Sequence, residues 1–523
     1  MELSAKNDQY WANFTVLPTD LEYLINFLLE GEEPKSLDAL TTVLIRYRCQ
    51  QLETLAQQSL SKGRVYRPAD VYEVGEAVIF PHLGNLLGEV VAVRDGHNPE
   101  HEPFSVIQVR MEEDGRVQEF AAALTTGHAL DEASYLPSDD VSPEELHTRY
   151  GSQVKAMLKE ALERDSHFVT VAGTWFVREL LMEVSPVQLN IAEAMLDMAS
   201  GGPLSTDALL AEMDLPAEIS EPLQLFSLEY ALEREGRFDE VGPAGQALWY
   251  LRRMEPQQVL EIPTHLRYVP IPYNRGFLDE SVLSLETLVD DEWSDASFDG
   301  DVTAEDTLTV TLSYPHWRSG TLPLTAKLAH LFPTARLTDH IQFTFVDGET
   351  GDEFPGWVVR SGRYVYGLEA FYASYNLEPG SYIDLAYGED PGKVLVSVRP
   401  FRSRRGEWLR TVSVDSDGFS FEVTRYPVFC EFDELSAVGV PDPEAVDALA
   451  ERLRQVSLES LVKQVFQGIA VLSLQRAVHA ETLYSVLNLL RRVPPAPMLA
   501  VLAAERQYYV SLGDHYWAYK GED

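Results

Sequence analysis

Apolar and polar residues follow a helical period through residues 186–234. The apolar positions between Leu189 and Met198 lie three or four apart, which gives one apolar helical face. A Gly-Gly-Pro sequence ends this helix, and Ser205 or Thr206 is placed to cap the next one. After a third apolar stripe, residues 238–251 alternate like two strands that are joined by a glycine-containing turn. The pattern predicts three helices followed by a hairpin.

The same order of elements returns near the end of the chain. Three apolar helical stripes precede an alternating stretch, residues 508–519, which turns at Gly513-Asp514. In both hairpins an aromatic residue opens the first strand, and a tryptophan, Trp249 or Trp517, lies in the second. A tryptophan at this position is expected to pack the hairpin onto the helices.

Three helices and a hairpin are the elements of a winged helix-turn-helix. We therefore expect one such domain in residues 186–256 and a second in residues 441–523. The fold binds nucleic acid or docks on other proteins, and both uses stay open. Neither candidate recognition helix is basic, which favours protein docking over reading of a DNA groove.

The first of these stretches resembles a known family. The sequence Pro-Leu-Ser-Thr-Asp-Ala-Leu-Leu at residues 203–210 and the wing Phe238…Trp249 resemble the HARE-type winged helix. That domain occurs in the delta subunit of bacterial RNA polymerase and beside restriction enzymes. The resemblance implies a protein of the transcription machinery.

A small β domain is predicted for residues 71–130, where short apolar strands are separated by glycine turns as in an SH3-like barrel. Its sequence Val-Gly-Glu-Ala-Val-Ile-Phe-Pro-His at residues 74–82 resembles the polymerase-binding barrel of CarD-like regulators and the transcription-repair coupling factor. The resemblance implies docking on RNA polymerase through the residues Val78, Phe80, Pro81 and His82. The sequence departs from that family at Asn85-Leu86-Leu87, where a shorter turn is usual, and unrelated small barrels contain similar turns.

The remaining segments complete a multi-domain α+β architecture with two winged helix-turn-helix domains, an SH3-like barrel and a larger mixed β-barrel. We expect a helical N-terminal segment (1–70), an acidic linker and helix (131–185), a Pro-rich and acidic linker (257–306) and the larger barrel (307–440). The acidic part of the third of these, residues 290–306, is expected to be mobile. Residues 367–385 resemble the DNA-binding pseudobarrels of plant transcription factors and of some restriction-enzyme recognition domains. Ser381 stands where that pattern has Asp, and an ordinary β-barrel is the alternative.

The net charge of −42 argues against a protein that coats nucleic acid nonspecifically, because phosphate affinity comes from Lys and Arg. Three explanations of the acidity stay open. The acidic surface keeps the protein soluble, it faces a basic surface of a partner, or it surrounds one local basic site. The two cysteines, Cys49 and Cys430, match no metal or redox spacing and fit a reducing compartment. No signal peptide and no apolar run of bilayer length is present, so we expect a cytoplasmic, bacterial protein with no membrane partner.

The chain carries no motif that indicates catalysis. It has no phosphate-binding loop, no Rossmann fingerprint, no zinc-protease motif and no nucleophile elbow. We therefore expect no enzyme, no cofactor and no metal site.

Arginines gather locally against the acidic background. Residues 399–410 contain five arginines with a Phe and a Trp, and planar guanidinium groups suit phosphate and base contacts. The alternative is that these arginines pair with the protein's own carboxylates. The candidate nucleic-acid-binding residues are Arg252, Arg253, Arg360, Arg363, Arg399, Arg402, Arg404, Arg405, Trp408, Arg410, Arg491 and Arg492.

Three hypotheses follow for the function. The first is a non-enzymatic, acidic, transcription-associated protein that docks on RNA polymerase, on DNA near it, or on both. The second is a sequence-specific DNA-binding protein, either a repressor or the recognition component of a restriction or defence system. The third is a protein scaffold without a nucleic-acid role.

Overall fold

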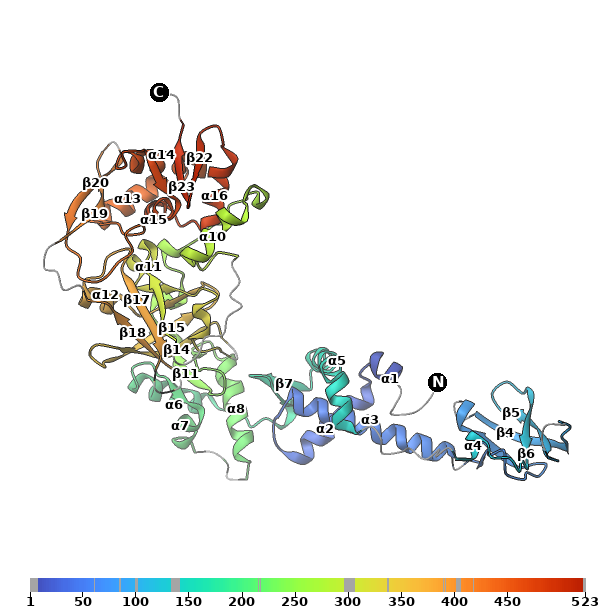
Figure 1. Ribbon diagram of the computed structural model, residues 1–523. Coiled ribbons are helices and arrows are strands. Elements are labelled where there is room, and N and C mark those ends of the chain that lie inside the picture. The colour runs from blue at the N-terminus through green and yellow to red at the C-terminus, as the bar shows by residue number, and fades with distance from the viewer. Residues whose placement is uncertain are drawn as a thin grey trace. The chain divides into compact units, whose positions relative to one another are not determined.

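The computed structural model describes residues 8–520, except residues 61, 84–85, 99–101, 133–141, 215, 217, 296–305, 336–337, 389, 391, 401–405 and 417 (Figure 1). The chain is of the mixed α+β class and contains several separate sheets. It divides into two compact units, Met1–Glu183 with Leu215–Ser227, and Val184–Asp214 with Leu228–Asp523.

One arrangement of six elements occurs three times. Each copy, here called a module, has the order helix, strand, helix, helix, strand, strand, and its last strand lies between the other two in the sheet. The first module consists of α2 (Pro18–Gly31), β1 (Lys35–Ser36), α3 (Leu37–Leu60), α5 (Pro143–Arg164), β7 (Phe168–Val171) and β8 (Thr174–Val177). The second consists of α6 (Pro186–Met198), β9 (Leu204–Ser205), α7 (Thr206–Ala211), α8 (Glu221–Arg234), β10 (Phe238–Glu240) and β11 (Leu248–Leu251). The third consists of α14 (Leu458–Ala470), β21 (Ala477–His479), α15 (Ala480–Leu490), α16 (Pro495–Ala504), β22 (Tyr509–Gly513) and β23 (Tyr516–Tyr519).

A buried tryptophan occupies the second position of the last strand in every module. Trp175, Trp249 and Trp517 are 4%, 1% and 6% exposed, and each pairs with a residue of the module's short first strand. The indole N–H of Trp249 donates to Thr206 Oγ1 at 2.9 Å, which ties the hairpin to the start of α7. Ser205, one of the two caps that the sequence allowed, caps that helix by accepting from the Ala208 amide at 3.2 Å.

The first module is assembled from two distant stretches of the chain. Figure 1 shows α3 and α5 side by side, although a β domain separates them in sequence. Arg46 and Lys155 make ion pairs across this contact with Glu144 at 2.8 Å and with Asp38 at 3.1 Å. The sequence had assigned residues 1–70 and 131–185 to separate segments, whereas the structure packs their helices together and pairs β1 with β8.

The inserted domain contains β2 (Arg64–Val65), β3 (Ala77–Phe80), β4 (Leu86–Asp95), β5 (Ser105–Met111) and β6 (Val117–Ala122), paired in that order. Only β2 and β3 are parallel. The amides of Ala123 and Leu124 donate to the carbonyls of Asp70 and Pro68, both at 2.9 Å, so the chain after β6 returns to the segment after β2. Its apolar core includes Tyr66, Tyr72, Phe80 and Ile107.

The largest sheet has seven strands in the order β12-β17-β18-β14-β15-β16-β13, and only β14 and β18 are parallel. The strands are β12 (Leu308–Thr311), β13 (Thr321–Pro323), β14 (His340–Asp347), β15 (Glu353–Val359), β16 (Tyr364–Tyr366), β17 (Tyr382–Tyr387) and β18 (Lys393–Val398). Along β14, every second side chain is buried, which is the pattern of a strand with one face in the core. The helices α11 (Tyr314–Ser319) and α12 (Glu369–Tyr375) contribute Tyr314 and Phe371 to buried clusters.

The second module and the third module both pack on this region of the chain. The hairpin of the second module lies on the large sheet, where the rings of Tyr250 and Trp357 meet edge to face at 5.2 Å. The third module shares one core cluster with the hairpin of β19 (Glu407–Val414) and β20 (Phe419–Tyr426) and with α13 (Pro443–Arg452). The remaining helices are α1 (Asp8–Ala12), α4 (Ala129–Glu132), α9 (Gln257–Leu260) and α10 (Glu280–Val289), with short 3-10 turns between them.

The predicted linker at residues 257–306 is ordered over much of its length. It contains α9, α10 and the 3-10 turn η5 (Arg275–Phe277). Asp291 and Glu292 are 5% and 6% exposed and form ion pairs with Arg492, both at 2.7 Å. The prediction of a mobile acidic linker is therefore wrong for Asp291 and Glu292, because their carboxylates neutralise a buried arginine. Residues 296–305 lie outside the described part of the chain.

Within the described residues, no single helix is long and apolar enough to cross a membrane. The pair α15 and α16 meets the length and composition test only together, and it is bent by 116°. Both helices lie in the core of the third module.

Candidate functional site

A winged helix-turn-helix, the fold expected from the sequence, presents its third helix to the DNA groove, so the third helix of each module is a candidate binding surface. These helices are α5, α8 and α16. Helix α5 carries four basic and four acidic residues, α8 carries one basic and three acidic residues, and α16 carries no charge. None has the excess of positive charge that phosphate binding requires.

Helix α16 is covered by its surroundings. Its residues Pro495–Ala503 are all buried, and it contacts α10 and η5 as well as its own module. The third module therefore has no exposed third helix.

Helix α5 has one buried and one exposed face. Leu146, Val154, Leu158 and Leu162 point into the first module. The opposite face, here called the α5 outer face, consists of the exposed residues Arg149, Ser152, Ala156, Lys159 and Glu163. The small side chains of Ser152 and Ala156 lie between the basic residues Arg149 and Lys159, which leaves room for a partner to approach the helix closely.

The described arginines of the predicted face on the β region make contacts inside the protein. The Arg399 guanidinium binds Asp384, with Nε at 2.7 Å from Oδ2, and its Nη2 also donates to Thr309. Arg410 donates to the carbonyls of Leu435 and Ala437, and its burial lowers its pKa to about 10. These contacts occupy both side chains with partners inside the protein.

Two further arginines of the β region are also engaged. Arg360 donates to the Pro333 carbonyl at 3.0 Å, and Arg363 donates to the Glu292 carbonyl and stacks over Trp293 at 4.6 Å. Trp408 is 67% exposed beside Arg425, whose guanidinium lies 5.8 Å from the ring. The predicted residues Arg402, Arg404 and Arg405 lie outside the described residues.

The arginines predicted on the two sequence-identified modules also contact the protein itself. Arg252 pairs with Asp239 at 3.3 Å, Arg253 with Asp197 at 2.6 Å, and Arg491 donates to the Leu453 carbonyl at 2.7 Å. The side chain of Arg492 is only 3% exposed, within its ion pairs to Asp291 and Glu292. The assignment of Arg492 to nucleic-acid binding is wrong, because a phosphate has no access to it.

The predicted docking residues of the inserted β domain separate into two groups. Val78 and Phe80 are completely buried in the domain core, so they cannot contact a partner, and this part of the prediction is wrong. Pro81 is half-buried and His82 is exposed in the turn after β3. Partial desolvation of its ring lowers the pKa of His82, and the nearby His128 lowers it further.

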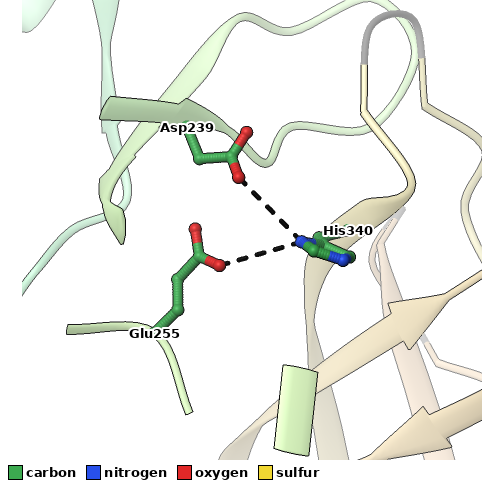
Figure 2. A group of neighbouring side chains, drawn as sticks. All are labelled: Asp239, Glu255 and His340. Atoms are coloured by element: carbon green, nitrogen blue, oxygen red, sulfur yellow. Dashed lines mark ion pairs between the residues drawn. The ribbon is translucent and has the colours of Figure 1, made fainter. Parts of the chain in front are cut away.

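A group that the sequence did not indicate lies where the second module meets the large sheet. Figure 2 shows the side chains of Asp239, Glu255 and His340 converging from three segments. Asp239 comes from β10, Glu255 follows the 3-10 turn η3 (Arg252–Met254), and His340 opens β14. The Nδ1 atom of His340 is 3.9 Å from Asp239 Oδ2 and 3.8 Å from Glu255 Oε2.

Three polar atoms of this group lack a hydrogen-bond partner among the described residues, whereas Asp239 Oδ2 accepts from Arg252 Nη2 at 3.3 Å. The three atoms are both carboxyl oxygens of Glu255 and the Nδ1 of His340. The side chain of Glu255 is completely buried, and its burial, with the adjacent Asp239, raises its pKa to about 8. Burial also lowers the pKa of His340, so both groups favour their neutral forms.

Residues 239, 255 and 340 are too far apart in the sequence to form a motif. Asp and Glu are also frequent throughout the chain, so Asp239 and Glu255 do not stand out in the sequence. Comparison of the chain with protein-family models, with curated proteins and with solved structures finds no match.

Proposed function

We propose that this protein is a non-enzymatic docking protein associated with transcription. Its three modules are winged helix-turn-helix domains, and its inserted five-stranded domain is an SH3-like barrel. The observation that carries this proposal is the α5 outer face, the exposed third helix of a module whose counterpart in the third module is buried. The first module and the inserted domain are the docking part, and the partner that the resemblances imply is RNA polymerase.

The charge of the third helices supports protein docking over DNA reading. A groove-reading helix needs positive charge near phosphates, whereas the four basic and four acidic residues of α5 cancel. The hairpin of the second module is packed on the large sheet, with the Ala244 amide donating to the Thr334 carbonyl at 2.6 Å, so this wing is engaged inside the protein.

Affinity purification of the full-length tagged protein from its host, with and without nuclease, tests this function. Polymerase subunits that persist after nuclease support it. Replacing residues 64–124 with a flexible linker removes the inserted domain, and we expect this variant to lose the polymerase subunits. Partners that disappear with nuclease treatment favour the sequence-specific DNA-binding alternative instead.

The DNA-binding alternative then depends on Arg402, Arg404 and Arg405. Their joint replacement by Ala is expected to weaken salt-sensitive DNA binding if that alternative holds, and to leave polymerase binding unchanged if the docking proposal holds.

A further inference from the structure

The side chains of Asp239, Glu255 and His340 have the composition of a metal site. Two carboxylate oxygens and one imidazole nitrogen lie within 4.8 Å of one another. In a tetrahedral zinc site with bonds of about 2.1 Å, ligand atoms are about 3.4 Å apart. The observed separations of 3.8 and 3.9 Å to His340 Nδ1 need only small side-chain movements to reach this value.

The environment of Glu255 indicates that a cation belongs here. A buried carboxylate normally accepts hydrogen bonds or pairs with a cation, because its desolvation is otherwise costly. Neither oxygen of Glu255 accepts a hydrogen bond from a donor group among the described residues, and the imidazole Nδ1 that faces them is also without a partner. The Asp239 carboxyl beside Glu255 is itself acidic, so it raises the pKa of Glu255 and does not supply a cation. Arg252 contacts only Asp239 in this group, at 3.3 Å, and its side chain is 54% exposed. It therefore does not fill the place between the three side chains.

We propose that Asp239, Glu255 and His340 bind one divalent transition-metal cation, which ties the second module to the seven-stranded sheet. The imidazole ligand selects this class, since zinc and similar ions accept nitrogen while magnesium and calcium prefer oxygen ligands throughout. The ligands come from the hairpin of the module, from the turn after it and from β14. The ion therefore adds a link between elements that are also joined by apolar packing and by the hydrogen bond from the Gln342 amide to the Val241 carbonyl at 2.9 Å.

The experiment uses the full-length protein, freed of metal with a chelator and titrated with zinc chloride. We expect one tightly bound zinc ion per chain and a rise in the thermal unfolding midpoint, because an ion that binds only the folded state stabilises it. Magnesium chloride is expected to give neither effect at the same concentration. Cobalt(II) provides a second readout, since its visible absorbance reports a site with few ligands.

The decisive variants are Glu255→Gln and His340→Gln. Each is expected to weaken zinc binding at least tenfold and to abolish the zinc-dependent rise of the midpoint and the cobalt absorbance. Glu255→Gln replaces the buried carboxyl with a neutral amide of nearly the same shape, so the metal-free variant is expected to fold and to be at least as stable as the metal-free wild type. His167→Gln is the matched control, because His167 lies 2.7 Å from Asp165 in an exposed pair. It should bind zinc like the wild type.

Three results would overturn the proposal. The first is equal zinc binding by the wild type and both variants. The second is an equal rise of the midpoint with magnesium and zinc. The third is a wild type without a tight site, which means that the carboxyl groups share a proton instead of a metal ion.

Discussion

The first and third modules have the same order of elements and the same strand order, yet the third helix is partly exposed in the first module and buried in the third. In the first module, α5 leaves the face from Arg149 to Glu163 exposed. In the third module, the nine residues from Pro495 to Ala503 are buried, and α10 and η5 contact the helix from outside the module. A shared topology therefore does not imply a shared role.

This difference in burial follows from the amino-acid composition of each helix. The sequence of α16 consists of Pro, Ala, Met, Leu and Val, so every side of it gains free energy from burial. Helix α5 alternates apolar and charged residues, so only one side does. We interpret the third module as part of the structural core and the first module as a surface that is available for binding.

The strongest test of this difference is Arg492→Ala in the third module. It leaves Asp291 and Glu292 buried without their cation, which is expected to cost about 3–5 kcal/mol of unfolding free energy. Denaturant unfolding measures the loss. Arg46→Ala breaks the exposed ion pair to Glu144 in the first module and should leave the midpoint unchanged. Equal effects of the two substitutions would contradict the comparison.

Leu499→Ala is expected to have the next largest effect. Leu499 is completely buried in α16, and truncating it is expected to cost about 2–4 kcal/mol through lost packing and a cavity. The control is Ser152→Ala on the α5 outer face, which is expected to change stability by less than about 0.5 kcal/mol. If Leu499→Ala behaves like Ser152→Ala, α16 is not part of a packed core.

A smaller, pH-dependent effect is expected from Asp447 in α13, beside the third module. Burial alone raises the pKa of this carboxyl, but hydrogen bonds from His265, Tyr314 and Arg318 hold it below the ordinary 3.8. Such a group stabilises the fold above its ordinary pKa, and the stabilisation is lost as the pH falls through the lowered value.

Asp447→Asn is therefore expected to be less stable than the wild type at pH 7, with a difference that narrows below pH 3.8. Unfolding midpoints of both proteins between pH 3 and 7 measure this. A difference that stays constant over the range would show that the charge of Asp447 is not its source.

The sequence predicted two of the three modules, because their helices and hairpins are continuous in the chain. It missed the first module because residues 61–142 separate its second and third helices. A signal was present: Phe168 opens a strand and Trp175 lies in the next one, as Phe238 and Trp249 do in the second module. All three modules contain this buried tryptophan, whereas the helices are close together in the sequence only in the second and third modules.

The candidate sites were less predictable than the elements. The count of arginines in residues 399–410 suggested a basic surface, but a count does not reveal that Arg399 and Arg410 are held by Asp384 and by the Leu435 and Ala437 carbonyls. The group of Asp239, Glu255 and His340 depends on the packing of the hairpin against the sheet, which no local pattern encodes. Burial likewise decides that Val78 and Phe80 are core residues.

The most direct test of the account is the nuclease-treated affinity purification repeated with the variant Arg149→Glu/Lys159→Glu. Both residues lie on the α5 outer face, so we expect the variant to keep the wild-type unfolding midpoint and to lose most of the polymerase subunits. Arg454→Glu, an exposed substitution beside the third module, is the matched control and should retain them. Polymerase recovery that is unchanged by the double substitution, or reduced equally by the control, would contradict the assignment of docking to the first module.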